Sequence, residues 1–315
     1  MAPTDPEASL AIRAVWLHYA GGLTQAAVAE RLGIPTVKAH RLIARAVADG
    51  VVKVSIDADI VECIDLERRL ADRYGLDHCE IAPDLGEDGL PLRAIGLVGA
   101  RYLRHEIERG HHGVIGFGHG RTLAAVVQEL PRLHAKNVVL VSLLGGLTRQ
   151  YAANPYDVMH RLAERLSAPA YVMPVPFFAN STSDRQVLLE QRGVREVFEM
   201  AERATLKLLG IGTADARAQL VTSGMIEPGE IADIAAAGGM GELLGNFFDA
   251  DGQIITTTLT GRTLAASFGD PATHRLVAVA GGAEKIGAIA AVLRSRRLTG
   301  LITDEGTAKA LVGDG

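Results

Sequence analysis

Apolar positions in the first fifty residues recur at spacings of three and four, the period of amphipathic helices. The pattern predicts helices over residues 8–20, 25–32 and 35–48 and a short strand over residues 51–56. Thr24 is placed to cap the second helix at its start, and Gly33 to end it. The first fifty residues therefore read as a compact three-helix unit closed by a strand.

Beyond this unit the pattern changes to short, continuous apolar runs that alternate with helical stretches. We expect strands over residues 79–83, 114–117, 138–144, 170–175, 206–211, 276–280 and 300–303. Runs as apolar as these are too hydrophobic for a half-exposed strand, so they predict a mainly parallel sheet with helices on both faces. A helix over residues 59–74 connects the two parts, and dimers often begin to pack at a connecting helix of this kind.

The second and third helices, joined by a tight glycine-containing turn, form a helix-turn-helix pattern. In that motif the second helix enters the DNA major groove. We expect Val37 on its inward face and Ala39 on its outward face. The candidate DNA-binding residues are Gln25, Thr36, Lys38, His40, Arg41 and Arg45. A plain helical hairpin with solvated Lys and Arg side chains is the alternative.

Four glycine-containing loops follow strands of the expected sheet. They are 116–122, 145–149, 210–213 and 281–285. Ligands of parallel sheets bind at the carboxyl ends of the strands, so these loops can share one pocket. For each loop alone, a tight chain reversal is the favoured explanation of its glycine, whereas four such loops at one edge of the sheet favour a shared pocket.

Composition narrows the class of protein. The 315 residues are 48% hydrophobic and 22% charged, with a net charge of −5, and no apolar run is long enough for a membrane span. Residues 1–53 carry +2 and the remaining 262 carry −7, which suits a DNA-binding head on an acidic body. With no signal-peptide pattern, we expect a cytoplasmic protein without membrane contact. Cys63 and Cys79 lie in no metal or disulfide spacing.

Several segments resemble one family of bacterial regulators. LTQAAVAERLGIPTVKAHRLIARAVADGVVKV resembles the helix-turn-helix of SorC-type and DeoR-type regulators. GFGHGRTL, LLGGLT, GIGT followed by SGMI, GELLGNFFDADG, VAVAGGAEKIGAI and LITDEGTA resemble the SorC-type sugar-binding domain. The resemblance implies a winged helix-turn-helix over residues 1–57, for DNA binding. It implies a Rossmann-like, mainly parallel α/β domain over 58–315, for effector binding and oligomerisation.

In fold, that effector domain is similar to glucosamine-phosphate deaminases, ribose-phosphate isomerases and CoA transferases. It binds sugars, polyols or their phosphates without converting them. Carried over to this chain, the resemblance implies pocket residues Gly118, Gly120, Arg121, Thr122, Gly145, Gly146, Leu147, Thr148, Asp249, Asp251, Gly281, Gly282 and Lys285. To these the strand-end positions add Gly212, Phe177 and Asn180, although a packed-core role for a phenylalanine here is equally expected. Lys285 is the expected partner of a phosphate or hydroxyl group.

The competing class is an isomerase-like or deaminase-like enzyme with an added head. The acidic cluster of the isomerases has no counterpart here, and Gly210-Ile211-Gly212 is not followed by the catalytic histidine of the deaminases. We therefore expect no catalytic residues. His111-His112 is expected in a solvated turn, with no metal site and no cofactor.

The expected protein is a transcriptional regulator of a carbohydrate or polyol operon. Its partners are operator DNA, a small carbohydrate, polyol or sugar-phosphate effector, and further copies of itself in a homodimer or homotetramer. One helix-turn-helix reads only a few base pairs, so a useful affinity requires two or more copies.

Overall fold

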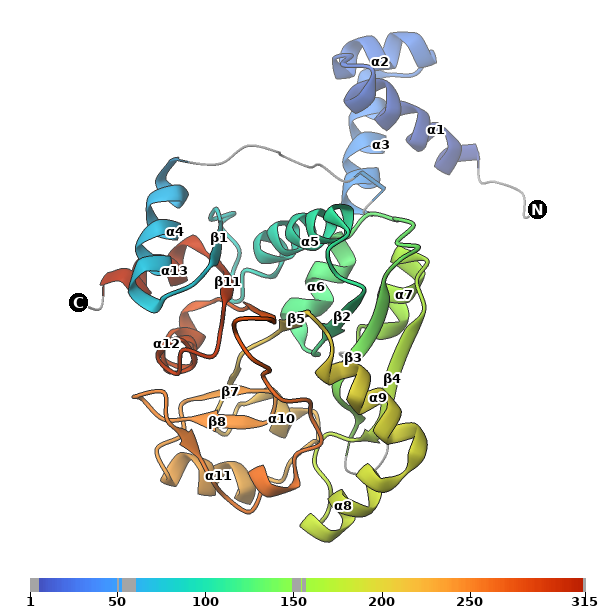
Figure 1. Cartoon of the computed structure of the whole chain (residues 1–315). Coiled ribbons are helices and arrows are strands. Elements are labelled where there is room, and N and C mark those ends of the chain that lie inside the picture. The colour runs from blue at the N-terminus through green and yellow to red at the C-terminus, as the bar shows by residue number, and fades with distance from the viewer. Residues whose placement is uncertain (1–5, 50, 53–60, 149–153, 155–156, 314–315) are drawn as a thin grey trace. The chain divides into compact units, whose positions relative to one another are not determined.

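The computed structural model describes residues 6–49, 51–52, 61–148, 154 and 157–313. The chain forms two compact units, Met1–Asp57 and Ala58–Gly315, called here the N-terminal unit and the body (Figure 1).

The N-terminal unit is built from the three expected helices. They are α1 (Pro6–Val15), continued by a π-helical turn (Trp16–Ala20), then α2 (Gln25–Leu32) and α3 (Thr36–Ala48). The Thr24 side chain accepts a hydrogen bond from the backbone N–H of Ala27 at 3.2 Å, and Gly33 ends α2 in the left-handed conformation at φ 64°. Both capping predictions are confirmed.

The faces of α3 differ from the prediction at two positions. Val37 is 81% exposed, whereas Ala39 is fully buried with Leu42 and Ile43 in the small core of this unit. The inward face therefore starts at Ala39, and Val37 lies on the opposite, outward side. The strand expected over residues 51–56 is not seen at 51 and 52, and its other residues lie outside the described part of the chain.

The body contains a parallel sheet of seven strands in the order β1-β11-β10-β5-β2-β3-β4. The strands are β1 (His78–Ala82), β2 (Val114–Phe117), β3 (Val139–Leu147), β4 (Ala170–Pro176), β5 (Leu206–Leu209), β10 (Arg275–Val279) and β11 (Gly300–Asp304). These are the seven expected strands, because parallel strands covered on both faces leave a strong apolar signal.

Helices cover both faces of this sheet (Figure 1). One apolar core holds side chains of α5 (Leu92–Arg109), α6 (Arg121–Glu129) and α7 (Met159–Leu166). A second core holds side chains of α4 (Val61–Tyr74), α9 (Arg192–Glu202), α12 (Ile286–Arg294) and α13 (Glu305–Gly313). Among the described residues, no helix has the length and apolarity that crossing a membrane requires.

A small antiparallel sheet adds to the second core, and the sequence did not predict it. It consists of β6 (Gly212–Thr213), β7 (Gly241–Leu243), β8 (Asn246–Phe248) and β9 (Ile254–Ile255). Helices α8 (Thr182–Glu190), α10 (Gln219–Thr222) and α11 (Pro228–Ala236) complete the body, with 3₁₀ turns at Thr260–Arg262 and Ala283–Lys285. Strands of two or three residues are too short to show an alternating pattern.

The centre of the large sheet contains a reversal in strand order. β2 and β5 are parallel neighbours, but β2 is followed by β3 on one side, while the next strand of this sheet after β5 is β10 on the other side. Where consecutive connections diverge in this way, a crevice opens at the carboxyl ends of the two strands. The topology therefore places a binding crevice beyond β2 and β5.

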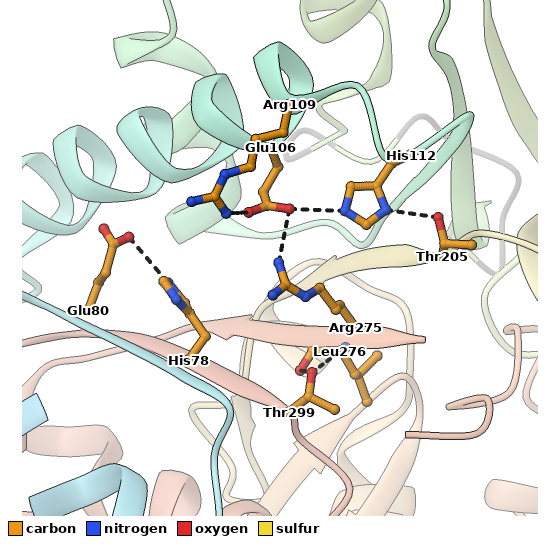
Figure 2. Close-up of polar contacts among 9 residues, drawn as sticks. All are labelled: His78, Glu80, Glu106, Arg109, His112, Thr205, Arg275, Leu276 and Thr299. Carbon is orange, nitrogen blue, oxygen red and sulfur yellow. Dashed lines mark hydrogen bonds and ion pairs between the residues drawn. The ribbon is translucent and has the colours of Figure 1, made fainter. Parts of the chain in front are cut away.

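The opposite, amino-terminal edge is held by a network around one buried carboxylate (Figure 2). Glu106, at the end of α5, is only 2% exposed. It accepts hydrogen bonds from Arg109 at 2.9 Å, from Arg275 at the start of β10 at 3.0 Å, and from His112 at 3.0 Å. The other ring nitrogen of His112 lies 2.9 Å from the hydroxyl of Thr205, just before β5.

His112 thus differs from the solvated histidine expected in this turn, since it is 7% exposed and joins α5 to the edge of the sheet. Burial by itself raises the pKa of the Glu106 carboxyl, but the hydrogen bond from His112 and the nearby positive charges outweigh it, so the pKa is lowered. A carboxylate with a lowered pKa stabilises the fold above its unfolded pKa, and the contribution is lost as the pH falls through the folded value.

We expect Glu106→Gln to lower the free energy of unfolding at pH 7 by about 1–3 kcal/mol, because it removes the anion to which the buried imidazole and two guanidinium groups donate hydrogen bonds. Urea unfolding across pH values measures this, and the difference from the native chain should shrink as the pH falls below about 4. Glu164→Gln is the matched control, because the Glu164–Arg132 pair is exposed and should contribute less than about 1 kcal/mol. Equal stability of Glu106→Gln and the native chain at pH 7 would contradict the role of the network.

Candidate functional site

A pocket lies in the crevice beyond β2 and β5, at the carboxyl edge of the sheet. It is lined by His119, Gly120, Arg121, Thr122, Gly210, Ile211, Gly212, Thr213, Asp215, Arg217, Gln219, Leu220, Ser223, Met225, Glu242, Glu284 and Lys285. These residues come from the loop after β2 and the start of α6, from the loop after β5, from the small sheet, from α10 and the residues around it, and from the turn before α12. The pocket therefore combines the large sheet with the small one.

The amino terminus of α6 forms one wall. Gly120 is its N-cap residue, with φ 124°, a conformation that side chains other than glycine rarely adopt. The first backbone N–H groups of a helix have no partner within the helix, and together with the helix dipole they favour an anion. Arg121, the first residue of α6, adds a positive charge, and its buried Nε has no hydrogen-bond partner in the described structure.

Two cationic side chains of the pocket lie close enough to repel each other. Lys285 is 9% exposed, and its ammonium group donates a hydrogen bond to the carbonyl of Ile211 at 2.8 Å. Burial and the charge of Arg121 lower the pKa of Lys285 to about 8, although Glu242 and Glu284 oppose the shift. An anion held between Arg121 and Lys285 would relieve this repulsion.

Glu242 is the buried carboxyl of the pocket. Burial raises its pKa to about 7, against the opposing effects of a backbone hydrogen bond from Gly245 and the charge of Lys285. A Cβ atom on Gly212 would come within 2.6 Å of the Glu242 carboxyl, so glycine at this position is what leaves room for it. Near neutral pH this group can both donate and accept hydrogen bonds to hydroxyl groups.

His119 lies beside these charges. Burial lowers its pKa to about 4, so the imidazole is neutral near pH 7. Its ring packs edge-on against Phe177 at 5.4 Å, and the buried Nδ1 has no hydrogen-bond partner in the described structure. The pocket thus presents a neutral imidazole, a titrating carboxyl and two cations.

In the N-terminal unit, the outward face of α3 carries the groups expected of a recognition helix. Thr36, Val37, His40 and Arg41 are all exposed there. The ring of His40 lies 2.9 Å from the Gln25 side chain, which ties the start of α2 to α3. Val37, which the hydrophobic pattern assigned to the core, adds an exposed apolar side chain to this face.

Comparison with known proteins agrees with this architecture. Residues 58–313 match the family model described as "Putative sugar-binding domain". The chain belongs to the SorC/DeoR-type family of sugar-binding transcriptional regulators.

Relatives cover nearly the whole length of the chain. It is 66% identical over 309 residues to the erythritol catabolism regulatory protein EryD of Brucella abortus, covering 98% of each chain. It is 32% identical to the transcriptional regulator LsrR of Klebsiella pneumoniae, covering 97% of this chain and 93% of that one. The full-length sorbitol operon regulator SorC of Klebsiella pneumoniae has a similar structure, with a TM-score of 0.72 at 26% identity over 98% of this chain and 100% of that one.

This SorC/DeoR-type chain is a transcriptional regulator and not an enzyme, because the relatives that match it over its length are regulators. The sequence-based choice between the two classes is confirmed. So is the expected fold class, a helical N-terminal region followed by a mainly parallel α/β domain.

The structure brings five of the expected effector residues into the pocket. They are Gly120, Arg121, Thr122, Gly212 and Lys285. Lys285 stands at the N-cap position of α12. Three of the four glycine loops thus contribute to the pocket of this SorC/DeoR-type body, as their positions at one sheet edge predicted.

The other expected residues lie elsewhere in the body. Gly145, Gly146 and Leu147 are inside β3, where a Cβ on Gly145 would meet the Pro176 carbonyl at 2.2 Å, and Thr148 is buried just beyond it. Gly118 extends the sheet by donating its N–H to Leu208 at 2.8 Å.

Phe177 is 1% exposed and packs against Phe178 in the core, while Asn180 is exposed and its carbonyl accepts a hydrogen bond from Arg262. Phe177 is therefore a core residue, which was one of the two expected roles. Asn180 does not line the pocket.

Asp249 and Asp251, and Gly281 and Gly282, take part in contacts that stabilise loops. Asp249 accepts hydrogen bonds from the backbone of Asp251 and Gln253 in the turn between β8 and β9. Gly281 lets Asp304 approach, since a Cβ there would lie 2.1 Å from its carboxyl oxygen, and the N–H of Gly282 donates to that carboxyl at 2.9 Å. These contacts hold loops together outside the pocket.

Sequence reasoning missed several lining residues. Glu242 stands inside the segment GELLGNFFDADG that carried the family resemblance, but the resemblance implied only the two aspartates further along as pocket residues. His119 lies in the expected loop 116–122, but its side chain was not among the expected pocket residues. Asp215, Arg217 and Gln219 lie in a segment without periodic pattern, so nothing distinguished them from solvated loop residues. Ser223 opens the segment SGMI that resembles the family, but it was not named as a pocket residue.

We expect Gly212→Ala to lower the free energy of unfolding by about 1–3 kcal/mol, because the added methyl group displaces the buried Glu242 carboxyl. Gly146→Ala is the matched control, since its Cβ would meet only a carbonyl at 3.9 Å, and it should change stability by less than about 0.5 kcal/mol. Denaturant unfolding of both variants decides the matter. If the two substitutions changed the free energy of unfolding equally, the Glu242 carboxyl would not be packed against Gly212 as described.

Proposed function

We propose that this chain regulates genes for the catabolism of a short polyol, with erythritol as the first candidate. The observation that carries the proposal is the 66% identity to the erythritol catabolism regulatory protein over 98% of both chains. Acting on operator DNA, it would work in the cytoplasm.

DNA binding is assigned to α3 of the N-terminal unit. Lys38, Arg41 and Arg45 would contact phosphates or bases, Gln25 a phosphate at the start of α2, and Thr36 and His40 base edges. Val37 joins them as an apolar group of the kind that contacts thymine methyls. Because one such unit reads only a few base pairs, two or four copies would bind an operator with pseudo-twofold symmetry.

The effector is assigned to the pocket beyond β2 and β5. The cations Arg121 and Lys285, with the start of α6, favour a phosphate group, while Glu242 and His119 suit the hydroxyl groups of the carbon chain. We therefore infer that the effector is a phosphorylated polyol or sugar rather than a neutral one. The proposed length of the effector, four carbons, is inferred from the erythritol catabolism regulatory protein and not from the pocket.

Calorimetric titration of the full chain with erythritol, erythritol 4-phosphate and inorganic phosphate tests the effector. The phosphate ester should bind tightest, and its addition should change the affinity for operator DNA in a mobility-shift assay. Tighter binding of free erythritol would overturn the phosphorylated effector while leaving polyol regulation in place. Binding of none of the three would count against erythritol catabolism.

For the DNA-binding face, we expect Arg41→Ala and Lys38→Ala each to weaken operator binding, by about 1–3 kcal/mol if the side chain reads a base and by less if it meets only phosphate. Mobility shifts at several salt concentrations separate the two cases, because loss of a phosphate contact lowers the salt dependence. Arg132→Ala, an exposed substitution in the body, is the control. Native affinity of either α3 variant at every salt concentration would remove that residue from the interface.

For the effector pocket, we expect Lys285→Met to weaken binding of erythritol 4-phosphate at least tenfold and to leave operator binding without effector unchanged. The variant keeps most of the side-chain volume but removes the charge that would face the phosphate. Lys309→Met, at an exposed lysine, should bind the ester as the native chain does. Native affinity for the ester in a folded Lys285→Met variant would leave Lys285 with a structural role only.

A further inference from the structure

Phe177 lies in the core of the body but packs against a residue that lines the pocket. Its ring meets the imidazole of His119 with 5.4 Å between the ring centroids and 86° between the ring planes. This edge-to-face arrangement is one of the two that aromatic rings prefer. Phe177 therefore restricts the orientations that the His119 ring can adopt.

The position of Phe177 is itself fixed by its surroundings. Its N–H donates a hydrogen bond to the carbonyl of Leu147 at 3.2 Å, and its carbonyl accepts one from the N–H of Leu264 at 2.8 Å. Its ring also packs against Phe178, with the centroids 4.4 Å apart. A side chain held in this way can keep a pocket residue in one geometry.

Phe177 also lies against the turn that holds Glu242. A Cβ atom on Gly245 would come within 3.2 Å of the Phe177 ring, so the backbone of this turn packs on the ring. The N–H of Gly245 donates a hydrogen bond to Oε1 of Glu242 at 2.6 Å. One core side chain thus contacts both the imidazole of the pocket and the turn that fixes its buried carboxyl group.

This turn has a strained backbone. Leu244 and Gly245 connect β7 to β8, and both have a positive φ, at 49° and 71°. A two-residue hairpin turn with two positive φ values suits glycine, whereas leucine rarely adopts the left-handed conformation. Strain of this kind persists only where the surrounding structure imposes it, and it is concentrated at functional sites. Here the turn places the Gly245 N–H where Glu242 accepts it.

The pocket carries two sets of polar groups. Nδ1 of His119 is buried and has no hydrogen-bond partner among the described residues, and Oε2 of Glu242 lies beside Gly212. A neutral imidazole nitrogen and a carboxyl oxygen suit hydroxyl groups, so these two atoms are called here the hydroxyl-binding groups. Arg121 and Lys285 suit an anion and are called the phosphate-binding groups.

We propose that Phe177 is the positioning residue of the hydroxyl-binding groups and thereby sets the affinity of the pocket for the carbon chain of the effector. The inference rests on the proposed function, which assigns the effector to this pocket. Phe177 acts through His119 and Glu242, since it does not line the pocket itself. The phosphate-binding groups do not depend on it, because Arg121 begins α6 and Lys285 precedes α12.

Phe177→Leu tests the proposal by calorimetric titration of the full chain with erythritol 4-phosphate, erythritol and inorganic phosphate. The variant should bind the erythritol compound that the native chain prefers about tenfold more weakly, the effect of about one lost hydrogen bond. Its affinity for inorganic phosphate should change by less than about twofold. A general loss of packing would not separate the two ligands in this way.

Phe178→Leu is the matched control. Phe178 is as buried as Phe177, at 1% exposed, and its ring packs against Phe177. Both substitutions remove similar apolar volume from the same core, so urea unfolding should show similar losses of stability. Only Phe177→Leu should lose affinity for the erythritol compound.

The imidazole of His119 provides a second measurement that needs no ligand. Burial alone lowers its pKa to about 4. In an NMR pH titration of the histidine-labelled native chain, with His119→Asn to assign the signal, the ring should stay neutral down to about pH 5. In Phe177→Leu water reaches the ring, and its pKa should rise toward the ordinary value of about 6.5. Phe178→Leu should titrate as the native chain does.

Several results would overturn the proposal. Equal losses of affinity in Phe177→Leu and Phe178→Leu would show an effect of core packing only. Equal weakening of the erythritol compound and inorganic phosphate would place the defect in the whole pocket. An unchanged titration of His119 in folded Phe177→Leu would show that Phe177 does not hold the imidazole. If the native chain bound neither erythritol compound, the proposed effector would fail, and the titration of His119 would still decide whether Phe177 positions it.

Discussion

The reversal in strand order between β2 and β5 is the constraint on which the body depends. Two parallel neighbours whose connections run to opposite sides cannot cover the space beyond their own carboxyl ends. The loop after β2 and the loop after β5 must therefore face each other across a crevice. The small sheet and the turn before α12 close the remaining sides, so the pocket is a product of topology before any side chain is considered.

Buried ionisable groups have opposite pKa shifts at the two edges of the sheet: the charged form is favoured at one edge and the neutral form at the other. At the amino edge, Glu106 is surrounded by three basic side chains, and its pKa is lowered. At the carboxyl edge, burial shifts Glu242 and Lys285 toward their neutral forms, to pKa values of about 7 and 8. The first arrangement ties α5 to the strands of the sheet. In the second, Glu242 and Lys285 have few partners within the protein, so they could bind a ligand.

The large sheet could be predicted from the sequence because each of its strands is apolar enough to be recognised alone. The faces of α3 were harder, since Val37 and Ala39 differ by two positions and a helix turns by 200° between them. The candidate site was predicted only in part. A glycine at a strand end gives the same sequence pattern whether it leaves space for a ligand or for a neighbouring part of the protein. Gly212 makes room for Glu242 in the pocket, and Gly145 makes room for the Pro176 carbonyl.

The cost of the buried cations suggests how a small ligand can control a regulator. Arg121 and Lys285 repel each other in a site with little solvent, so any arrangement that keeps them close without an anion is raised in free energy. A phosphate of the proposed effector, bound between them, would lower the free energy of that arrangement alone. Binding of that effector would therefore shift the population toward whichever form of the body holds Arg121 and Lys285 together, by an amount set by its difference in affinity for the two forms.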